Sequence, residues 1–142
     1  MQYEFKNSFG NTFLLTKFDP GNNWIYNDWQ GLLSMEGIVE GCAGMLNILR
    51  HTHCPYMLND NTRLQGSWKH ANDWLATTLV PQVVEAGLRY YAHVAAPGVF
   101  GQASAEDLHL RVGTTFEMRI FETLEEAQEW LRDMQHQNQP AT

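Results

Sequence analysis

Two histidines and a cysteine in the segment His51-Thr-His53-Cys54 are the most compact set of metal-binding side chains in the chain. Imidazole and thiolate groups bind zinc and copper. A closed zinc site needs four ligands, however, and no second ligand pair at suitable spacing occurs; the nearest candidate is Cys42. The alternative is a helix end, where histidines cap the last carbonyls. The sequence favours the helix end, so no metal or other cofactor is expected.

Several hydroxyl, thiol and imidazole groups could form a nucleophile and base pair. The nucleophiles would be Thr62, Ser67 or Cys54, and the bases would be His70, His93 or His109. No Gly-x-Ser-x-Gly turn surrounds any serine, which argues against the hydrolase arrangement. Ser67 stands where a helix is expected to begin, so we interpret it as an N-cap.

Two carboxylates, Asp60 and Asp73, could meet across a strand-to-helix turn and act as acid and base. Asp60 more simply binds the backbone donors of its own turn. Neither the phosphate loop nor the dinucleotide glycine motif is present. The sequence therefore favours a protein that is not an enzyme and gives no catalytic residue.

The segment from Tyr56 to Trp68 locates the predicted binding face. A short apolar run gives way to small polar residues, and a helix is expected to start at Gly66-Ser67. In an open α/β sheet, ligands bind where the chain leaves the carboxyl ends of parallel strands. Aromatic residues nearby could line an apolar pocket. The candidate binding residues are Asn59, Asp60, Asn61, Thr62, Ser67, Trp68, His93 and Phe100.

Composition narrows the range of partners. The chain has 142 residues, enough for one domain with a sizeable core, and 44% are hydrophobic. Its formal net charge is −7 and it has no basic block, which argues against nucleic acid and anionic membranes. No signal peptide or spanning segment is evident, and two cysteines make no disulfide framework. We expect a cytoplasmic protein whose partner is another protein or a small molecule.

Hydrophobic periodicity predicts alternating strands and helices after an opening meander. Strands are expected at 3–5, 12–18, 24–29, 56–59, 89–95 and 115–121. Helices are expected from Ser34 to Arg50, from Ser67 to a stop at Gly87 with a restart near Pro81, from Ser104, and from the capping box at Thr123. Glycines 37, 41 and 44 suggest that the first helix packs closely on the sheet.

This order predicts a single α/β domain over residues 1–134, followed by a frayed polar tail at 135–142. An N-terminal antiparallel meander would lead into β-α-β-α-β units with neighbouring parallel strands. The result would be a mixed sheet.

Four segments resemble a group of small bacterial proteins described as STAS-like or SpoIIAA-like. They are Leu58-Asn-Asp-Asn-Thr62, Ser67-Trp68, Glu85-Ala-Gly-Leu-Arg-Tyr90 and Leu124-Glu-Glu-Ala-Gln-Glu-Trp-Leu131. The resemblance covers about residues 2–132. It implies a non-enzymatic domain with helices mainly on one face of the sheet. In anti-sigma-factor antagonists a serine or threonine at the start of the helix after a central strand is phosphorylated, which here points to Thr62 or Ser67.

We expect first a regulatory or protein-binding module that uses the face at residues 59–68. The alternative is a small-molecule-binding protein, or an unassigned enzyme, with a crevice at the carboxyl ends of the parallel strands. A third hypothesis is a homodimer that pairs through an exposed edge of the meander.

Overall fold

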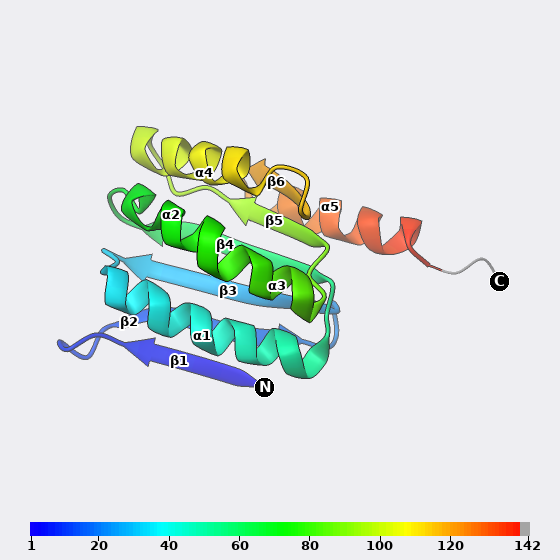
Figure 1. Cartoon of the computed structure of the whole chain (residues 1–142), viewed down its shortest axis with the longest axis horizontal. Coiled ribbons are helices and arrows are strands. Elements are labelled where there is room, and N and C mark those ends of the chain that lie inside the picture. Colours follow the sequence, from blue (N-terminus) through cyan, green and yellow to red (C-terminus); the bar gives the residue numbers. More distant parts are fainter. Residues whose placement is uncertain (140–142) are drawn as a thin grey trace.

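The computed structural model describes residues 1–139 and shows an α/β domain built on one mixed sheet (Figure 1). In the described chain the sheet has six strands in the order β1-β2-β3-β4-β5-β6, and the first three are antiparallel. β3 to β6 run parallel to one another. The bounds are β1 Gln2–Lys6, β2 Thr12–Asp19, β3 Trp24–Gly31, β4 Tyr56–Leu64, β5 Tyr90–Val94 and β6 Glu117–Phe121. The predicted mixed sheet is confirmed.

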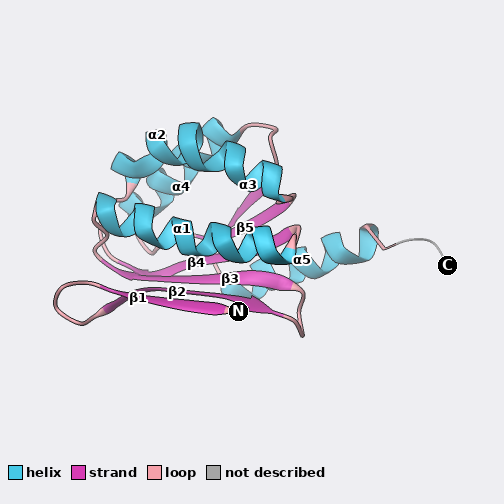
Figure 2. Cartoon of the chain, turned by 60° about the horizontal axis from the view of Figure 1, so that its bottom comes forward, coloured by secondary structure: helices cyan, strands magenta, loops and turns pink. Residues whose placement is uncertain are grey.

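Most of the helical segments cover one face of the sheet (Figure 2). They are α1 Met35–Thr52, the 3-10 turn η1 Lys69–Ala71, α2 Asn72–Trp74, the π-helical turn η2 Leu75–Leu79, α3 Val80–Ala86 and α4 Val99–Val112. The last helix, α5 Leu124–Gln137, lies on the other face, where the Trp130 ring packs 5.8 Å from that of Phe121. The prediction of helices mainly on one face is confirmed. Over the described residues, no helix is both long and apolar enough to cross a bilayer.

Close packing of α1 on the sheet is confirmed by its glycines. A Cβ atom at Gly41 would lie 2.7 Å from Leu14 and 2.9 Å from Trp29. The helix begins as predicted, because the Ser34 hydroxyl accepts a hydrogen bond of 3.0 Å from the Gly37 amide. The α1 backbone therefore lies nearer to β2 and β3 than side chains at these positions would allow.

The polar residues at 60–62 lie within a strand, whereas the sequence predicted that the strand ends at Asn59. β4 continues to Leu64 because its backbone pairs with β3 as far as Gly31 opposite Leu64, whereas its pairing with β5 ends at Asp60 opposite Val94. The expected helix start is also wrong. Helical structure begins at Lys69, whose amide donates to the Ser67 hydroxyl at 3.2 Å in a local turn.

The start predicted for the next helix at Ser104 is wrong as well. α4 begins at Val99, and the buried Ser104 hydroxyl lies inside the helix, where it donates to the Phe100 carbonyl at 2.8 Å. Serine bonds to its own backbone in either setting, which makes it a weak boundary signal. The predicted restart at Pro81 and the stop at Gly87, with φ of +116°, are confirmed.

The last helix begins at the predicted cap and runs further than expected. The Glu126 amide donates to the Thr123 hydroxyl at 3.2 Å. Residues 135–137, predicted to be frayed, are helical, and the Gln135 side-chain amide donates to the Asn22 and Asn23 carbonyls. Residues 140–142 lie outside the described part of the chain.

Candidate functional site

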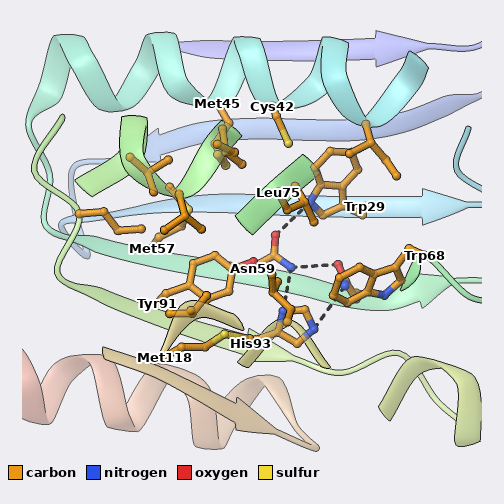
Figure 3. Close-up of a pocket in the computed structure, with 18 of the residues that line it drawn as sticks. Trp29, Cys42, Met45, Met57, Asn59, Trp68, Leu75, Tyr91, His93 and Met118 are labelled. Carbon is orange, nitrogen blue, oxygen red and sulfur yellow. Dashed lines mark hydrogen bonds between the residues drawn. The ribbon is translucent and has the colours of Figure 1, made fainter. Parts of the chain in front are cut away.

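A cavity of about 80 Å³ lies between the sheet and the helices α1, η2, α3 and α4 (Figure 3). Its apolar wall comes from each of these elements. α1 contributes Ile38, Cys42 and Met45, the segment from α2 to α3 contributes Leu75, Leu79 and Val83, and α4 contributes Leu108 and Val112. Met57, Tyr91 and Met118 line it from the sheet. Such a space, lined by apolar side chains with polar groups at one place, has the general form of a ligand pocket.

Three polar side chains lie together on the floor of the cavity. Asn59 and Asn61 come from β4, and His93 comes from β5. Side chains two residues apart share one face of a strand, and the parallel register puts Asn59 opposite His93. All three are buried, with exposed fractions of 3%, 3% and 1%. A polar side chain in such a place is stable only if its hydrogen-bonding groups are satisfied.

Hydrogen bonds join this cluster to the neighbouring strand β3. The Trp29 indole N–H donates to Asn59 Oδ1 at 2.9 Å, and Asn59 Nδ2 donates to Asn61 Oδ1 at 3.0 Å. Asn59 Nδ2 also lies 3.4 Å from His93 Nδ1, and Asn61 Nδ2 lies 3.4 Å from His93 Nε2. In Figure 3 the contacts with Trp29, Asn61 and His93 meet at Asn59. The cluster is therefore a connected network at the cavity floor.

Burial sets the protonation state of His93. Desolvation lowers its pKa from 6.5 to about 4, and the charge of Asp60 acts in the opposite direction. The imidazole is therefore neutral at neutral pH, with one N–H donor and one acceptor nitrogen.

Trp68 closes the polar end of the cavity. Its ring centroid lies 5.6 Å from that of His93, and the residue is 5% exposed. Its indole nitrogen is buried and has no hydrogen-bond partner among residues 1–139. An unsatisfied buried N–H is costly, and each such group in a native fold calls for an explanation.

The cavity has no charged lining. None of the described residues around it is Asp, Glu, Lys or Arg. An ion placed there would lose its hydration without gaining an opposite charge. The cavity therefore suits an uncharged molecule.

Asp60 lies on the opposite face of the sheet, away from the cavity. Its carboxylate accepts hydrogen bonds from the Tyr26 hydroxyl at 2.8 Å and from the Thr62 amide at 3.0 Å. The second contact confirms the predicted local turn-like role, although it occurs within a strand. On the next strand Asp28 is paired with Arg63 at 3.2 Å. Burial raises the pKa of the Asp28 carboxyl, and Arg63 partly opposes the shift.

The predicted candidates therefore divide among separate places. Asn61, Trp68 and His93 meet at the cavity together with Asn59, but Asp60 does not. Asn59, Asp60 and Asn61 are buried, so they cannot form part of a free contact surface. Thr62 and Ser67 are exposed, and the Ser67 hydroxyl lies 3.2 Å from that of Ser104. Phe100 is 69% exposed on α4 and does not line the cavity, contrary to the expected crevice.

The side chains of the His51-x-His53-Cys54 segment have separate partners. His51 Nδ1 lies 2.8 Å from the Asn47 carbonyl, and His53 Nδ1 lies 3.4 Å from the Ala86 carbonyl. The Cys54 thiol donates to the Asn23 carbonyl. The helix-end interpretation is confirmed, since the His53 amide also donates to the Leu49 carbonyl. Within the described residues, no three His, Cys, Asp or Glu side chains are grouped as metal ligands.

The acid and base pairs considered as alternatives do not form around Asp73, Ser67 or His109. Asp73 is bound to Arg111 at 3.4 Å on the helical side of the sheet, so it does not meet Asp60. The Ser67 hydroxyl contacts Ser104 and the Lys69 amide, and His109 Nε2 contacts the Met118 carbonyl.

Sequence reasoning missed Trp29, Asp28 and the methionines of the cavity. Trp29 sits in a strand that was predicted correctly, but its role follows from the pairing of β3 with β4. One sequence signal for the role of Trp29 was available. The Asn and Trp side chains of a buried strand carry polar groups, and these groups need hydrogen-bond partners inside the protein.

No protein-family model matches the chain, and the comparisons with curated proteins and with solved structures find no match either. The interpretation of the site therefore rests on its geometry.

Proposed function

We propose that this protein binds a small, uncharged, mainly apolar molecule in the cavity beneath α1, α3 and α4. The observation that carries the proposal is a space left open inside the core whose only cluster of polar side chains, within the described chain, is Asn59, Asn61 and His93. A core that served stability alone would gain from apolar side chains there, because buried polar groups are costly. Pockets for small molecules combine an apolar wall with a few placed polar groups.

The size of the cavity limits the ligand. A space of about 80 Å³ is smaller than an engineered cavity of about 150 Å³ that accepts benzene. Met45, Met57 and Met118 line it, and methionine side chains change rotamer readily. A molecule of about one ring therefore fits once these side chains move.

An NMR titration with toluene tests the proposal. We expect toluene to shift the backbone amide resonances of the cavity residues. Val83→Phe fills the cavity from α3 and should abolish these shifts, because Val83 is 3% exposed and lines the space. Val39→Phe makes the same change on the outer side of α1, where Val39 is 38% exposed, and should leave binding intact. Absence of binding, or binding that Val83→Phe does not weaken, would contradict the proposal.

A regulatory module is the second candidate function. It is supported by the exposure of Thr62 and Ser67, which lie just before Trp68 at the cavity. A phosphate on Ser67 would displace its contact with the Ser104 hydroxyl and add negative charge to an acidic protein. Peptide mapping of the protein purified from its own cells tests this function. Phosphate at either residue, or a protein that co-purifies, would support it; an unmodified chain without a partner would count against it.

A further inference from the structure

The amide groups at the cavity floor have fixed orientations. The Trp29 indole can only donate, so the Asn59 atom that it contacts must be the oxygen. The Asn59 nitrogen then faces both Asn61 and His93. Because this nitrogen can only donate, the Asn61 atom 3.0 Å from it must be the oxygen. The nitrogen of Asn61 is thereby left facing His93.

Both ring nitrogens of His93 therefore face side-chain NH₂ groups. Nδ1 lies 3.4 Å from Asn59 Nδ2, and Nε2 lies 3.4 Å from Asn61 Nδ2. A neutral imidazole has only one acceptor nitrogen. One of the two contacts can be a hydrogen bond, and in the other two N–H groups point at each other.

No rearrangement of the same side chains gives every N–H group an acceptor. Turning the His93 ring by 180° puts its carbon atoms against both NH₂ groups, which then have no acceptor there. Reversing Asn61 brings its NH₂ group against that of Asn59. Reversing Asn59 leaves the Trp29 N–H facing an NH₂ group. Protonating His93 adds a further donor. The cluster therefore has at least one more N–H group than its acceptors can take.

Trp68 contributes a further N–H group without an acceptor. Its indole N–H is buried and meets no acceptor in the part of the chain that the structure describes. Its ring lies against that of His93, and both residues line the cavity. The polar end of the cavity is thus rich in donors and short of acceptors.

We propose that the ligand of this cavity presents a carbonyl-type oxygen to the surplus N–H groups of Asn61, His93 and Trp68. The inference rests on the proposed small-molecule function and specifies its ligand class: an uncharged, mainly apolar ketone, aldehyde, ester or amide. A carbonyl oxygen has two acceptor sites and no hydrogen, so it can take two of these N–H groups. A carboxylate would also accept, but no cationic side chain of the described residues lines the cavity to balance its charge.

A matched pair of probes tests the inference. Acetophenone carries a carbonyl oxygen, and α-methylstyrene has the same shape with a CH₂ group in place of that oxygen. NMR titration gives both dissociation constants. We expect acetophenone to bind at least about tenfold more tightly, because only its oxygen satisfies the buried donors. Equal affinities, or tighter binding of the hydrocarbon, would overturn the inference.

The substitution Asn61→Asp removes the surplus N–H donor of the cluster. A carboxylate at residue 61 can accept from both Asn59 Nδ2 and His93 Nε2–H, so the preference for acetophenone should fall to within about threefold. Asn11→Asp makes the same chemical change in an exposed turn and should leave the preference unchanged. A preference that Asn61→Asp retains in full would overturn the assignment of these donors.

Imidazole nitrogen NMR provides a test that needs no variant. Free protein should show His93 as a neutral imidazole with one protonated nitrogen, and acetophenone should move the proton resonance of that N–H, or of the Asn61 NH₂ group, downfield. A bound ketone that leaves these resonances and the Trp68 indole N–H unmoved would overturn the inference. If toluene does not bind, the proposed function itself fails; if toluene binds and acetophenone gains nothing over α-methylstyrene, only the acceptor inference fails.

Discussion

The indole N–H of Trp29 on β3 donates a hydrogen bond of 2.9 Å to the side-chain oxygen of Asn59 on β4. Trp68 has nearly the same burial, 5% against 7% exposed, yet its indole N–H lacks a partner among the described residues. The cavity is thus lined by one tryptophan whose indole N–H is hydrogen-bonded and by another whose indole N–H is not. The two positions allow the same substitution to be compared with and without a hydrogen bond.

Trp29→Phe should lower the free energy of unfolding more than Trp68→Phe does. Both substitutions remove similar buried area, but only the first leaves Asn59 Oδ1 without its donor, which costs about 1–2 kcal/mol more. Urea unfolding of the two variants measures the difference. Equal losses, or a larger loss for Trp68→Phe, would show that the bond does not contribute as the geometry implies.

Asp28→Asn should change how stability depends on pH. Burial raises the pKa of Asp28 above its ordinary value of 3.8, so between 3.8 and the raised pKa the folded protein holds a proton that the unfolded chain has lost. The stability contributed by Asp28 is therefore fully present below pH 3.8 and declines as the pH rises through the folded pKa.

The asparagine variant cannot titrate at this position, so the difference in unfolding free energy between it and the native protein should vary with pH in that window. Thermal unfolding from pH 3 to pH 7 measures it. Asp133→Asn, on the exposed side of α5, is the control and should leave the pH dependence as it is. A constant difference for Asp28→Asn would contradict the raised pKa.

Gly41→Ala should destabilise the protein although alanine favours helices. The helix propensity gain is about 1 kcal/mol, but the new methyl group would meet buried Leu14 and Trp29 at 2.7 and 2.9 Å. Overpacking of this kind costs about 1–3 kcal/mol, so the net effect is a loss. Gly37→Ala meets its neighbours at 3.2–3.3 Å and should cost less. Chemical denaturation compares the two, and a more stable Gly41→Ala protein would contradict the close approach of α1.

His93 should make the protein sensitive to mild acid. Its folded pKa of about 4 lies below the unfolded value of 6.5, so between these values the unfolded chain takes up a proton that the folded protein excludes. Stability contributed by His93 is present above pH 6.5 and falls by about 3 kcal/mol as the pH drops to 4.

Denaturation at pH 7, 6, 5 and 4 measures this loss. His93→Gln should be much less sensitive over the same range, because glutamine does not titrate. His70→Gln, at an exposed position, should behave like the native protein. A His93→Gln protein as acid-sensitive as the native one would assign the loss to other groups.

The order of elements followed from the sequence because its signals are local. The connection between the strands expected at 12–18 and 24–29, the cap at Ser34 and the stop at Gly87 are set by neighbouring residues, and each lies within one residue of where the pattern indicated. The extent of β4 did not follow, since its residues beyond Asn59 are held in the strand by pairing with β3, and with β5 only at Asp60. Small polar residues in a row normally indicate a loop, and long-range pairing overrides that preference.

The site was predictable only in part, because it too depends on long-range strand pairing. Asn61, Trp68 and His93 were among the candidates because they lie near the carboxyl ends of predicted strands. Alternation along β4 separates Asp60 from them, and a strand prediction that ended at Asn59 could not show which face each residue takes. Phe100 was assigned to a crevice because α4 was expected to begin five residues later than it does.

The strands of the sheet lie side by side in the order in which they are synthesised. A chain emerging from the ribosome can therefore add each strand to an existing edge, without waiting for a distant partner. The last part of the cavity wall, from Leu108 to Met118, is synthesised only after the wall residues Met57 and Tyr91 of the sheet. During that interval the nascent chain exposes an apolar surface, so chaperone dependence during translation should end once residues 99–121 have left the exit tunnel.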